Sequence, residues 1–352
     1  MAKKSKRIRS GRAPIAITTG DHRGIGPEVI SKGLNVLIKR KRLLSASDVI
    51  IFGIPELYRP FKRLLPAKWQ VWTENDIESS SWPGPVTGHL NFIVPYANHI
   101  EPNRRAAYSC GRYIELATLG ALRGVFSAIT TGPIDKNELH RGGYRYDGHT
   151  EMLKDLCKAP SVTMMMAGLK MRTTLVTTHE ALRDVSRKLS TDKIVTCIDN
   201  TLNGLMRDFA IKRPKIAVLG LNPHASDGGL FGDEEKTMIE PAIALARTRF
   251  PKALIDGPFP PDGFFAQWQQ RYSKTYDAIV CMYHDQGLIP IKLLDFENTV
   301  NVSLGLPIVR TSVDHGVGYD IAGKNQADAA SFCAALRLAA SIVKRRGNHV
   351  QK

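Results

Sequence analysis

Short apolar runs alternate with amphipathic stretches of helical periodicity along most of this 352-residue chain. Such apolar runs predict buried strands, and apolar residues at helical spacing between them predict helices. We expect strands at 14–18, 48–53, 125–130, 161–166, 172–177, 215–221 and 278–283, and helices at 28–38, 105–122, 193–207, 233–249 and 326–344. Strands that alternate with helices build a mostly parallel α/β sheet whose functional loops follow the carboxyl ends of the strands.

The chain is longer than one compact core of ordinary size needs, so we expect a two-lobed α/β protein. We assign residues 13–130 plus 298–352 to the first lobe and residues 131–297 to the second. Residues 65–103 show weak periodicity and many Pro, Trp and polar residues, which predicts an irregular excursion or a hairpin.

Six basic residues within positions 1–12 contribute to a formal net charge of +16. We interpret this segment as a flexible, solvated tail. The alternative is a nucleic-acid-binding arm on an enzyme-like fold, although the segment has no aromatic residue to stack on bases. The remaining positive charge suits a small anionic substrate.

The composition is that of a folded globular protein, with 43% hydrophobic and 23% charged residues. No apolar run approaches the roughly 20 residues that cross a bilayer, and no secretory signal is evident. The five cysteines are scattered singly, as is typical of reduced thiols. We therefore expect a cytoplasmic protein that neither enters a membrane nor holds structural zinc on thiolates.

Three histidines each follow an expected strand, namely His179, His224 and His284. The carboxyl ends of neighbouring parallel strands share one edge of a sheet, so these side chains can meet there. Neutral imidazoles bind zinc and related divalent ions, and three protein ligands leave a position open for a substrate. General bases, or hydrogen-bonded loop residues, are the alternatives.

Two loops are weaker candidates for binding. Residues 20–28, Gly-Asp-His-Arg-Gly-Ile-Gly-Pro-Glu, form either a loop whose amides face an anion or a purely structural turn. This stretch has neither the Rossmann spacing nor the P-loop ending. His149 and Thr150 open a helical stretch, where they either grip substrate oxygens or, in the case of Thr150, cap the helix.

Candidate site residues are densest between positions 283 and 323. Lys292, Asn301 and Arg310 can together bind a phosphate or carboxylate through charge-assisted hydrogen bonds, and scattered surface cations are the alternative. Four aspartates are candidates for metal binding, proton transfer or loop structure: Asp21, Asp262, Asp285 and Asp314.

Four of these segments together resemble the PdxA family, the 4-hydroxythreonine-4-phosphate dehydrogenases of pyridoxal phosphate biosynthesis. They read Val-Thr-Thr-His at 176–179, Gly-Leu-Asn-Pro-His-Ala at 220–225, Met-Tyr-His-Asp-Gln-Gly at 282–287, and Gly-Leu-Pro-Ile-Val-Arg-Thr-Ser-Val-Asp-His-Gly at 305–316. Their order and spacing extend the resemblance over nearly the whole chain, from about Pro14 to Phe332.

The resemblance implies a fold similar to isocitrate and isopropylmalate dehydrogenases, and a homodimer whose interface lies in the second lobe and whose active sites are shared. One divalent ion (Zn, Mg, Co or Mn) would be bound by the three histidines, the third coming from the partner chain. The substrate contacts it implies are His149, Thr150, Asp262, Lys292, Asn301 and Arg310. The implied NAD or NADP site includes Asp314, His315, Gly316 and Asp320.

The implied reaction is oxidation of 4-phosphooxy-L-threonine by NAD followed by loss of carbon dioxide. A metal ion would lower the pKa of the substrate hydroxyl, and the cofactor would take the hydride. Lys292 and Asp262 are the candidate general bases. The chain departs from the family's usual residues in four places. It has His22 for proline, Ser-Asp at 226–227 for Gly-Glu, Pro-Pro-Asp-Gly at 260–263 for Pro-Ala-Asp-Thr, and Val-Gly at 317–318 for Thr-Ala. Paralogues that oxidise 4-phospho-threonate, 4-phospho-erythronate or a terephthalate cis-dihydrodiol are therefore alternatives.

Overall fold

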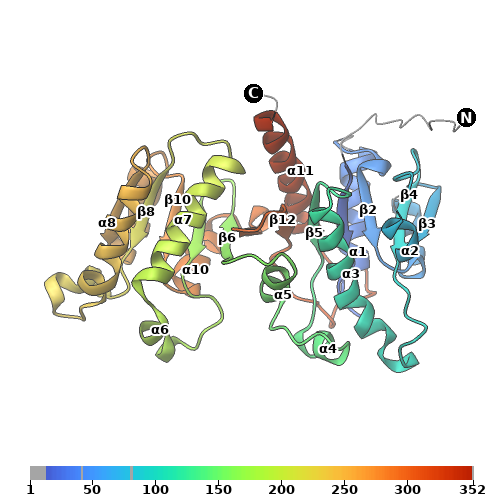
Figure 1. Cartoon of the computed structure of the whole chain (residues 1–352), viewed down its shortest axis with the longest axis horizontal. Helices are drawn as coiled ribbons and strands as arrows, with labels where there is room; N and C mark the ends of the chain where they lie inside the picture. The colour runs from blue at the N-terminus through green and yellow to red at the C-terminus, as the bar shows by residue number, and fades with distance from the viewer. Residues whose placement is uncertain (1–12, 41–42, 80–81, 351–352) are drawn as a thin grey trace, which may run out of the picture.

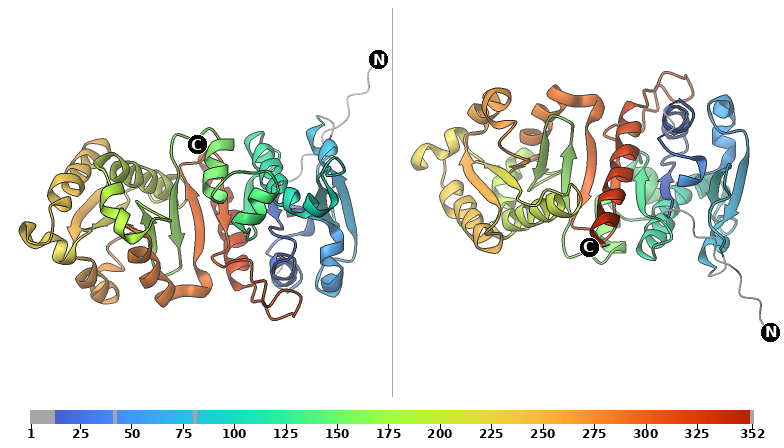
Figure 2. Two further views of the ribbon diagram at one scale, coloured as in Figure 1. Left: turned by 90° about the horizontal axis from the view of Figure 1, so that it is seen from below. Right: turned by 90° about the horizontal axis from the view of Figure 1, so that it is seen from above.

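The computed structural model describes residues 13–40, 43–79 and 82–350. The predicted tail at 1–12 lies outside these residues. Within them, twelve strands form one sheet in the order β3-β4-β2-β1-β5-β12-β11-β6-β7-β10-β8-β9. Helices cover the sheet, and the molecule has two lobes with α11 between them (Figures 1 and 2). The prediction of a two-lobed, mostly parallel α/β protein is confirmed.

The two halves of the sheet run in opposite directions. Six strands from β3 to β12 are parallel, and β7, β10, β8 and β9 form a second parallel set. The connecting pairs β12–β11, β11–β6 and β6–β7 are all antiparallel. Elements far apart in sequence therefore become neighbours at the junction, where β12 and β11 lie between β5 and β6. The predicted lobe boundaries stay a prediction.

The first half is built from residues at both ends of the described chain. Its strands are β1 (Ile15–Thr18), β2 (Val49–Phe52), β3 (Trp69–Thr73), β4 (Leu90–Val94), β5 (Ala128–Thr131) and β12 (Arg310–Ser312). Its main helices are α1 (Gly26–Leu34), α2 (Glu74–Glu78), α3 (Arg105–Leu122), α4 (Lys136–Arg141), α5 (His149–Leu156) and α11 (Ala330–Val350).

The second half carries all three predicted metal-binding histidines. Its strands are β6 (Thr163–Ala167), β7 (Arg172–Leu175), β8 (Lys215–Leu219), β9 (Leu254–Phe259), β10 (Ala278–Cys281) and β11 (Val300–Leu304). Its helical elements are α6 (Leu182–Lys188), α7 (Thr191–Arg207), η5 (Pro223–Gly229), η6 (Glu235–Ile239), α8 (Glu240–Arg249), α9 (Pro261–Ala266) and α10 (His284–Asp295).

The prediction for residues 65–103 is wrong in part. This stretch contains β3 and β4, which pair in parallel and therefore do not form a hairpin. A buried polar residue interrupts the apolar pattern of β4. Asn91 is fully buried, and its side chain donates to the carbonyls of Val86 and His89 and accepts from the indole of Trp72.

Apolar side chains pack on both faces of the sheet. One buried cluster joins α1, α7, α8 and α11 to their strands, a second underlies α3 and α5, and a third lies beneath α9 and α10. Within the described ranges, no helix combines the length and the apolar character that crossing a membrane requires.

Candidate active site

Arg310 is a buried cation without a carboxylate partner. It begins β12, is only 2% exposed, and its guanidinium donates to the hydroxyls of Thr131 (2.8 and 3.2 Å) and Ser303 (3.1 Å). Burial lowers the pKa of Arg310 to about 9, and the charge of Glu151 opposes this effect. A buried guanidinium whose hydrogen-bond partners are all neutral hydroxyls favours the arrival of an anion.

Two further buried polar atoms near Arg310 have no hydrogen-bond partner in the described chain: Nε2 of His149 and Oδ1 of Asn301. Asn301 lies on β11 opposite Ser312 of β12, one strand from Arg310. Burial, followed by the charge of Arg310, holds the pKa of His149 well below its usual value, so its ring is neutral. Unsatisfied buried groups are costly, which points to a ligand that completes them.

Lys292 and Asp314 form an ion pair between α10 and the loop after β12, with 3.2 Å between Nζ and Oδ2. Burial raises the pKa of Asp314, while Lys292, His315 and His284 act in the opposite direction. The carboxylate thus lies near three basic groups from α10 and the loop after β12. His315 also has a buried Nε2 without a hydrogen-bond partner among the described residues.

His179 and His284 lie together, with 5.8 Å between their ring centroids. They follow β7 and β10, which are parallel neighbours, and they line a cavity of about 470 Å³. Nδ1 of His284 is 2.7 Å from Oδ1 of Asp285, which leaves Nε2 of that ring available as a ligand. Two imidazoles backed by a carboxylate suit a divalent metal ion.

Within one chain, His224 lies apart from the pair of His179 and His284. It follows β8, which pairs with β10, but it is exposed on η5. No three His, Cys, Asp or Glu side chains in the described part of the chain gather around one point. The structure therefore brings together two of the three predicted metal ligands.

The remaining predicted residues lie apart from these contacts or have a different local role. Asp262 is exposed on α9, which packs against η5. Thr150 is the second residue of α5, whose N-cap is Gly148, so the capping alternative for Thr150 is wrong. Gly316 and Asp320 are exposed in the loop after β12.

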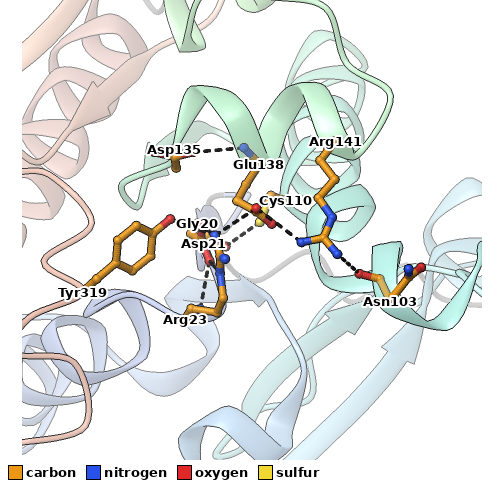
Figure 3. A network of polar contacts seen from close by, with 9 residues as sticks. All are labelled: Gly20, Asp21, Arg23, Asn103, Cys110, Asp135, Glu138, Arg141 and Tyr319. Carbon is orange, nitrogen blue, oxygen red and sulfur yellow. Dashed lines mark hydrogen bonds and ion pairs between the residues drawn. The ribbon is translucent and has the colours of Figure 1, made fainter.

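The glycine-rich loop at 20–28 is held by its own backbone hydrogen bonds, and His22, Arg23 and Gly24 line a cavity of about 620 Å³. Its amides at Asp21, Gly24 and Ile25 donate to backbone carbonyls, and the amide of Arg23 donates to the side chain of Asp21. They therefore do not face a ligand. The Asp21 carboxylate also accepts from Arg23 and, at 2.5 Å, from the hydroxyl of Tyr319 (Figure 3). This network fixes the loop after β12, which contains the predicted cofactor residues.

Sequence patterns did not single out several residues that shape the site. Thr131 and Ser303 hold Arg310, yet both are small polar residues at the ends of buried strands. Gln286 is 6% exposed, and its amide donates to the carbonyl of Gly220 (2.8 Å) and accepts from the amide of Met282 (2.6 Å). Gln286 belongs to the Met-Tyr-His-Asp-Gln-Gly segment at 282–287, but that segment was interpreted only through His284 and Asp285.

Comparisons with known proteins identify the family of this chain. The family model described as pyridoxal phosphate biosynthetic protein PdxA matches residues 46–339. The chain belongs to the PdxA family. A 4-hydroxythreonine-4-phosphate dehydrogenase of Trichlorobacter lovleyi is 39% identical over 94% of this chain and 98% of its own. One of Geobacter metallireducens is 41% identical, covering 95% of this chain and 96% of its own.

Solved structures give the same relationship. The chain is similar to a crystal structure of 4-hydroxythreonine-4-phosphate dehydrogenase from Klebsiella pneumoniae, with a TM-score of 0.77 and 36% identity. The match covers 94% of this chain and 99% of that one. The chain therefore has the same fold as that relative over nearly the full length of both proteins.

One departure from the usual PdxA pattern is accommodated inside the fold. His22 stands where the family usually has proline, and its Nε2 lies 2.8 Å from the hydroxyl of Tyr113. Burial lowers the pKa of His22 to about 4. The ring is therefore neutral at physiological pH and acts as a hydrogen-bonded part of the loop.

Proposed function

We propose that the chain is an NAD-dependent, divalent-metal-dependent dehydrogenase that oxidises and decarboxylates 4-phosphooxy-L-threonine. The observation that carries this proposal is the buried Arg310 guanidinium, which has no carboxylate partner among the described residues and lies near the unpaired polar atoms of His149 and Asn301. The guanidinium suits a phosphate, which brings negative charge and hydrogen-bond acceptors, whereas Oδ1 of Asn301 accepts and would take a donor such as a substrate hydroxyl or ammonium group. The names of the relatives supply the identity of the phosphorylated substrate.

In this proposal the anion pocket anchors one end of the substrate. Arg310 neutralises the phosphate, and the side-chain amide nitrogen of Asn301 can donate to it. His149 is neutral in the free protein, so one of its ring nitrogens can donate to a phosphate or hydroxyl oxygen while the other accepts. Thr150, next to it, would contribute a hydroxyl.

The donor set at the other end fits a divalent metal ion. His179 and His284 would hold it, His224 would join them only when two chains assemble into the proposed dimer, and Asp285 would orient the ring of His284. The ion would lower the pKa of the substrate hydroxyl and stabilise the developing negative charge on oxygen. NAD would accept the hydride near the loop that contains Asp314, His315, Gly316 and Asp320.

Lys292 is the better placed of the two candidate general bases. It lies on α10 beside Asp314, whose carboxylate can take up or release a proton through their 3.2 Å contact. Asp262 is exposed on α9, in the element that packs against the turn of His224. We therefore propose that Lys292 is the general base that accepts the proton of the substrate hydroxyl.

A homodimer is part of the proposal because α10 exposes an apolar face. Ile289, Leu293 and Phe296 are 63%, 88% and 58% exposed and follow one another at helical spacing. The same helix carries His284 and Lys292, so a second copy seated here would border the site.

Replacing Leu293 with Asp is expected to convert the dimer to single chains, because a carboxylate cannot be buried unpaired in an apolar interface. Sedimentation velocity measures the outcome. Val71, which is 47% exposed on the edge strand β3, provides the matched control, and its change to Asp should leave the dimer intact. A wild-type protein that sediments as single chains would remove the dimer from the proposal.

The proposed function is tested by NADH formation from 4-phosphooxy-L-threonine, 4-phospho-threonate, 4-phospho-erythronate and a terephthalate cis-dihydrodiol. We expect the first to be oxidised most efficiently, and we expect a chelator to stop the reaction until a divalent ion is restored. Preference for another member of the panel would reassign the substrate. If no compound is oxidised with chelator sensitivity, the proposal is wrong.

A further inference from the structure

The turn that carries His224 has a backbone conformation that is rare for residues with side chains. His224, Ala225, Ser226 and Asp227 all have positive φ, between 45° and 74°, and two glycines with positive φ follow. In this region Cβ crowds the next carbonyl oxygen. Four such residues in succession persist only where surrounding contacts hold them.

Those contacts converge on the carboxylate of Glu235. This side chain is 2% exposed, and its Oε1 accepts from the backbone amides of Leu221 and Asn222, both at 2.8 Å. Its Oε2 accepts from the side-chain amide of Asn222 (2.9 Å) and from the hydroxyl of Ser226. One buried carboxylate thus binds the chain on both sides of His224.

Ser226 is a second anchor of the turn. It has a φ of +74°, a conformation that glycine adopts without strain but a residue with a side chain does not. Its side chain is buried, and its hydroxyl lies within hydrogen-bond distance of Glu235 and of the carbonyl of Gly232. The bond to Glu235 offsets the conformational cost of a side chain at this position.

The same carboxylate packs against Gly220, and the carbonyl of Gly220 is bonded to the start of α10, the helix that carries His284. A Cβ at Gly220 would lie 2.9 Å from Oε1 of Glu235, so the close approach requires glycine at the end of β8. The carbonyl of Gly220 in turn accepts from Gln286, which lies in the first turn of α10. Glu235 and Gln286 therefore fix the relative positions of the segments that carry His224 and His284.

We propose that Glu235 is a positioning residue that holds His224 in its left-handed turn and thereby sets the affinity of the site for its metal ion. This inference rests on the proposed function, because His224 is a metal ligand only there. Glu235 itself contacts neither metal nor substrate. A histidine already held in the binding conformation loses little freedom when it binds, so affinity increases.

The test is a titration of the full-length protein with Co²⁺, whose visible absorption reports the ligand geometry. We expect Glu235→Gln to weaken Co²⁺ binding about tenfold and to change the spectrum, because an amide has one acceptor oxygen in place of two. Glu234 is the matched control. Its carboxylate accepts from the side-chain amide of Asn222, as that of Glu235 does, and from the hydroxyl of Ser186, but it lies nearer the surface. Glu234→Gln should keep the wild-type spectrum and affinity.

Two further variants separate positioning from general stability. Ser226→Ala removes one bond to Glu235 and should weaken Co²⁺ binding by a smaller factor, while Glu235→Asp, which retains the charge, should restore part of the affinity. The unfolding temperature without metal identifies a variant that fails to fold. Wild-type affinity and spectrum in both Glu235→Gln and Ser226→Ala would overturn the inference. Absence of Co²⁺ binding by the wild type would overturn the proposed metal site as well.

Discussion

Changing Arg310 to Met is expected to make the ligand-free protein more stable while abolishing its activity. The guanidinium is buried among neutral hydroxyls, so its charge is desolvated without a counter-ion. A methionine of similar length removes that cost, and we expect a gain of about 1–3 kcal/mol in the free energy of unfolding at pH 7. We expect kcat/KM to fall about 10³-fold, because the phosphate would lose its bidentate partner.

The pH dependence of this gain follows from the lowered pKa of Arg310. Below about pH 9 the folded wild type keeps the buried charge, so the methionine variant has its full advantage. As the pH rises above 9, folded Arg310 loses its proton while the unfolded chain stays charged, so the wild type gains stability and the difference shrinks. Urea denaturation at pH 7 and at pH 10 measures both values.

Inorganic phosphate provides a check that is independent of turnover. It should raise the unfolding temperature of the wild type and leave that of Arg310→Met unchanged. Arg59 serves as the control because its side chain is 71% exposed, and Arg59→Met should alter neither stability nor the phosphate effect measurably. Loss of stability in Arg310→Met, with the phosphate effect retained, would contradict the anion pocket.

The sequence predicted elements with regular periodicity and missed those whose pattern is broken. The expected helix at 105–122 agrees with α3 at both ends. The helix α10 was not predicted because Gly287 and Pro290 lie inside it, and both residues usually interrupt helices. The short strands β11 and β12 were not predicted, because each is short and contains a polar residue, Asn301 in β11 and Arg310 in β12.

Site residues that bind by themselves were easier to anticipate than residues that support them. The three histidines stand out because each follows an apolar strand, and His179 and His284 do lie together. Glu235 carries no such signal: it lies nine positions after Ser226, and its role arises only from the left-handed turn that contains Ser226. Backbone conformation of this kind is a property of the folded chain, so residue patterns alone do not reveal it.

Removing a histidine of the proposed metal site is expected to lower both activity and metal binding strongly. His284→Ala is expected to lower kcat at least 10³-fold and to weaken Co²⁺ binding by a similar factor, because it removes one of two imidazoles that a single chain already brings together. Metal content after dialysis and NADH formation are the two measurements. His89 is a half-buried histidine whose ring nitrogen Nδ1 lies 3.2 Å from the carbonyl oxygen of Thr87, and the control His89→Ala should match the wild type in both.

A milder change at Asp285 distinguishes metal binding from a general-base role for His284. Asp285→Asn keeps a hydrogen-bond acceptor near Nδ1 but removes its charge, so a metal-bound ring should lose about 10- to 100-fold in affinity. Excess Co²⁺ would then restore the activity of Asp285→Asn. A general base would respond differently, because added metal cannot replace the lost carboxylate and the pH optimum would shift instead. Full metal content in His284→Ala, with activity lost, would assign His284 to proton transfer.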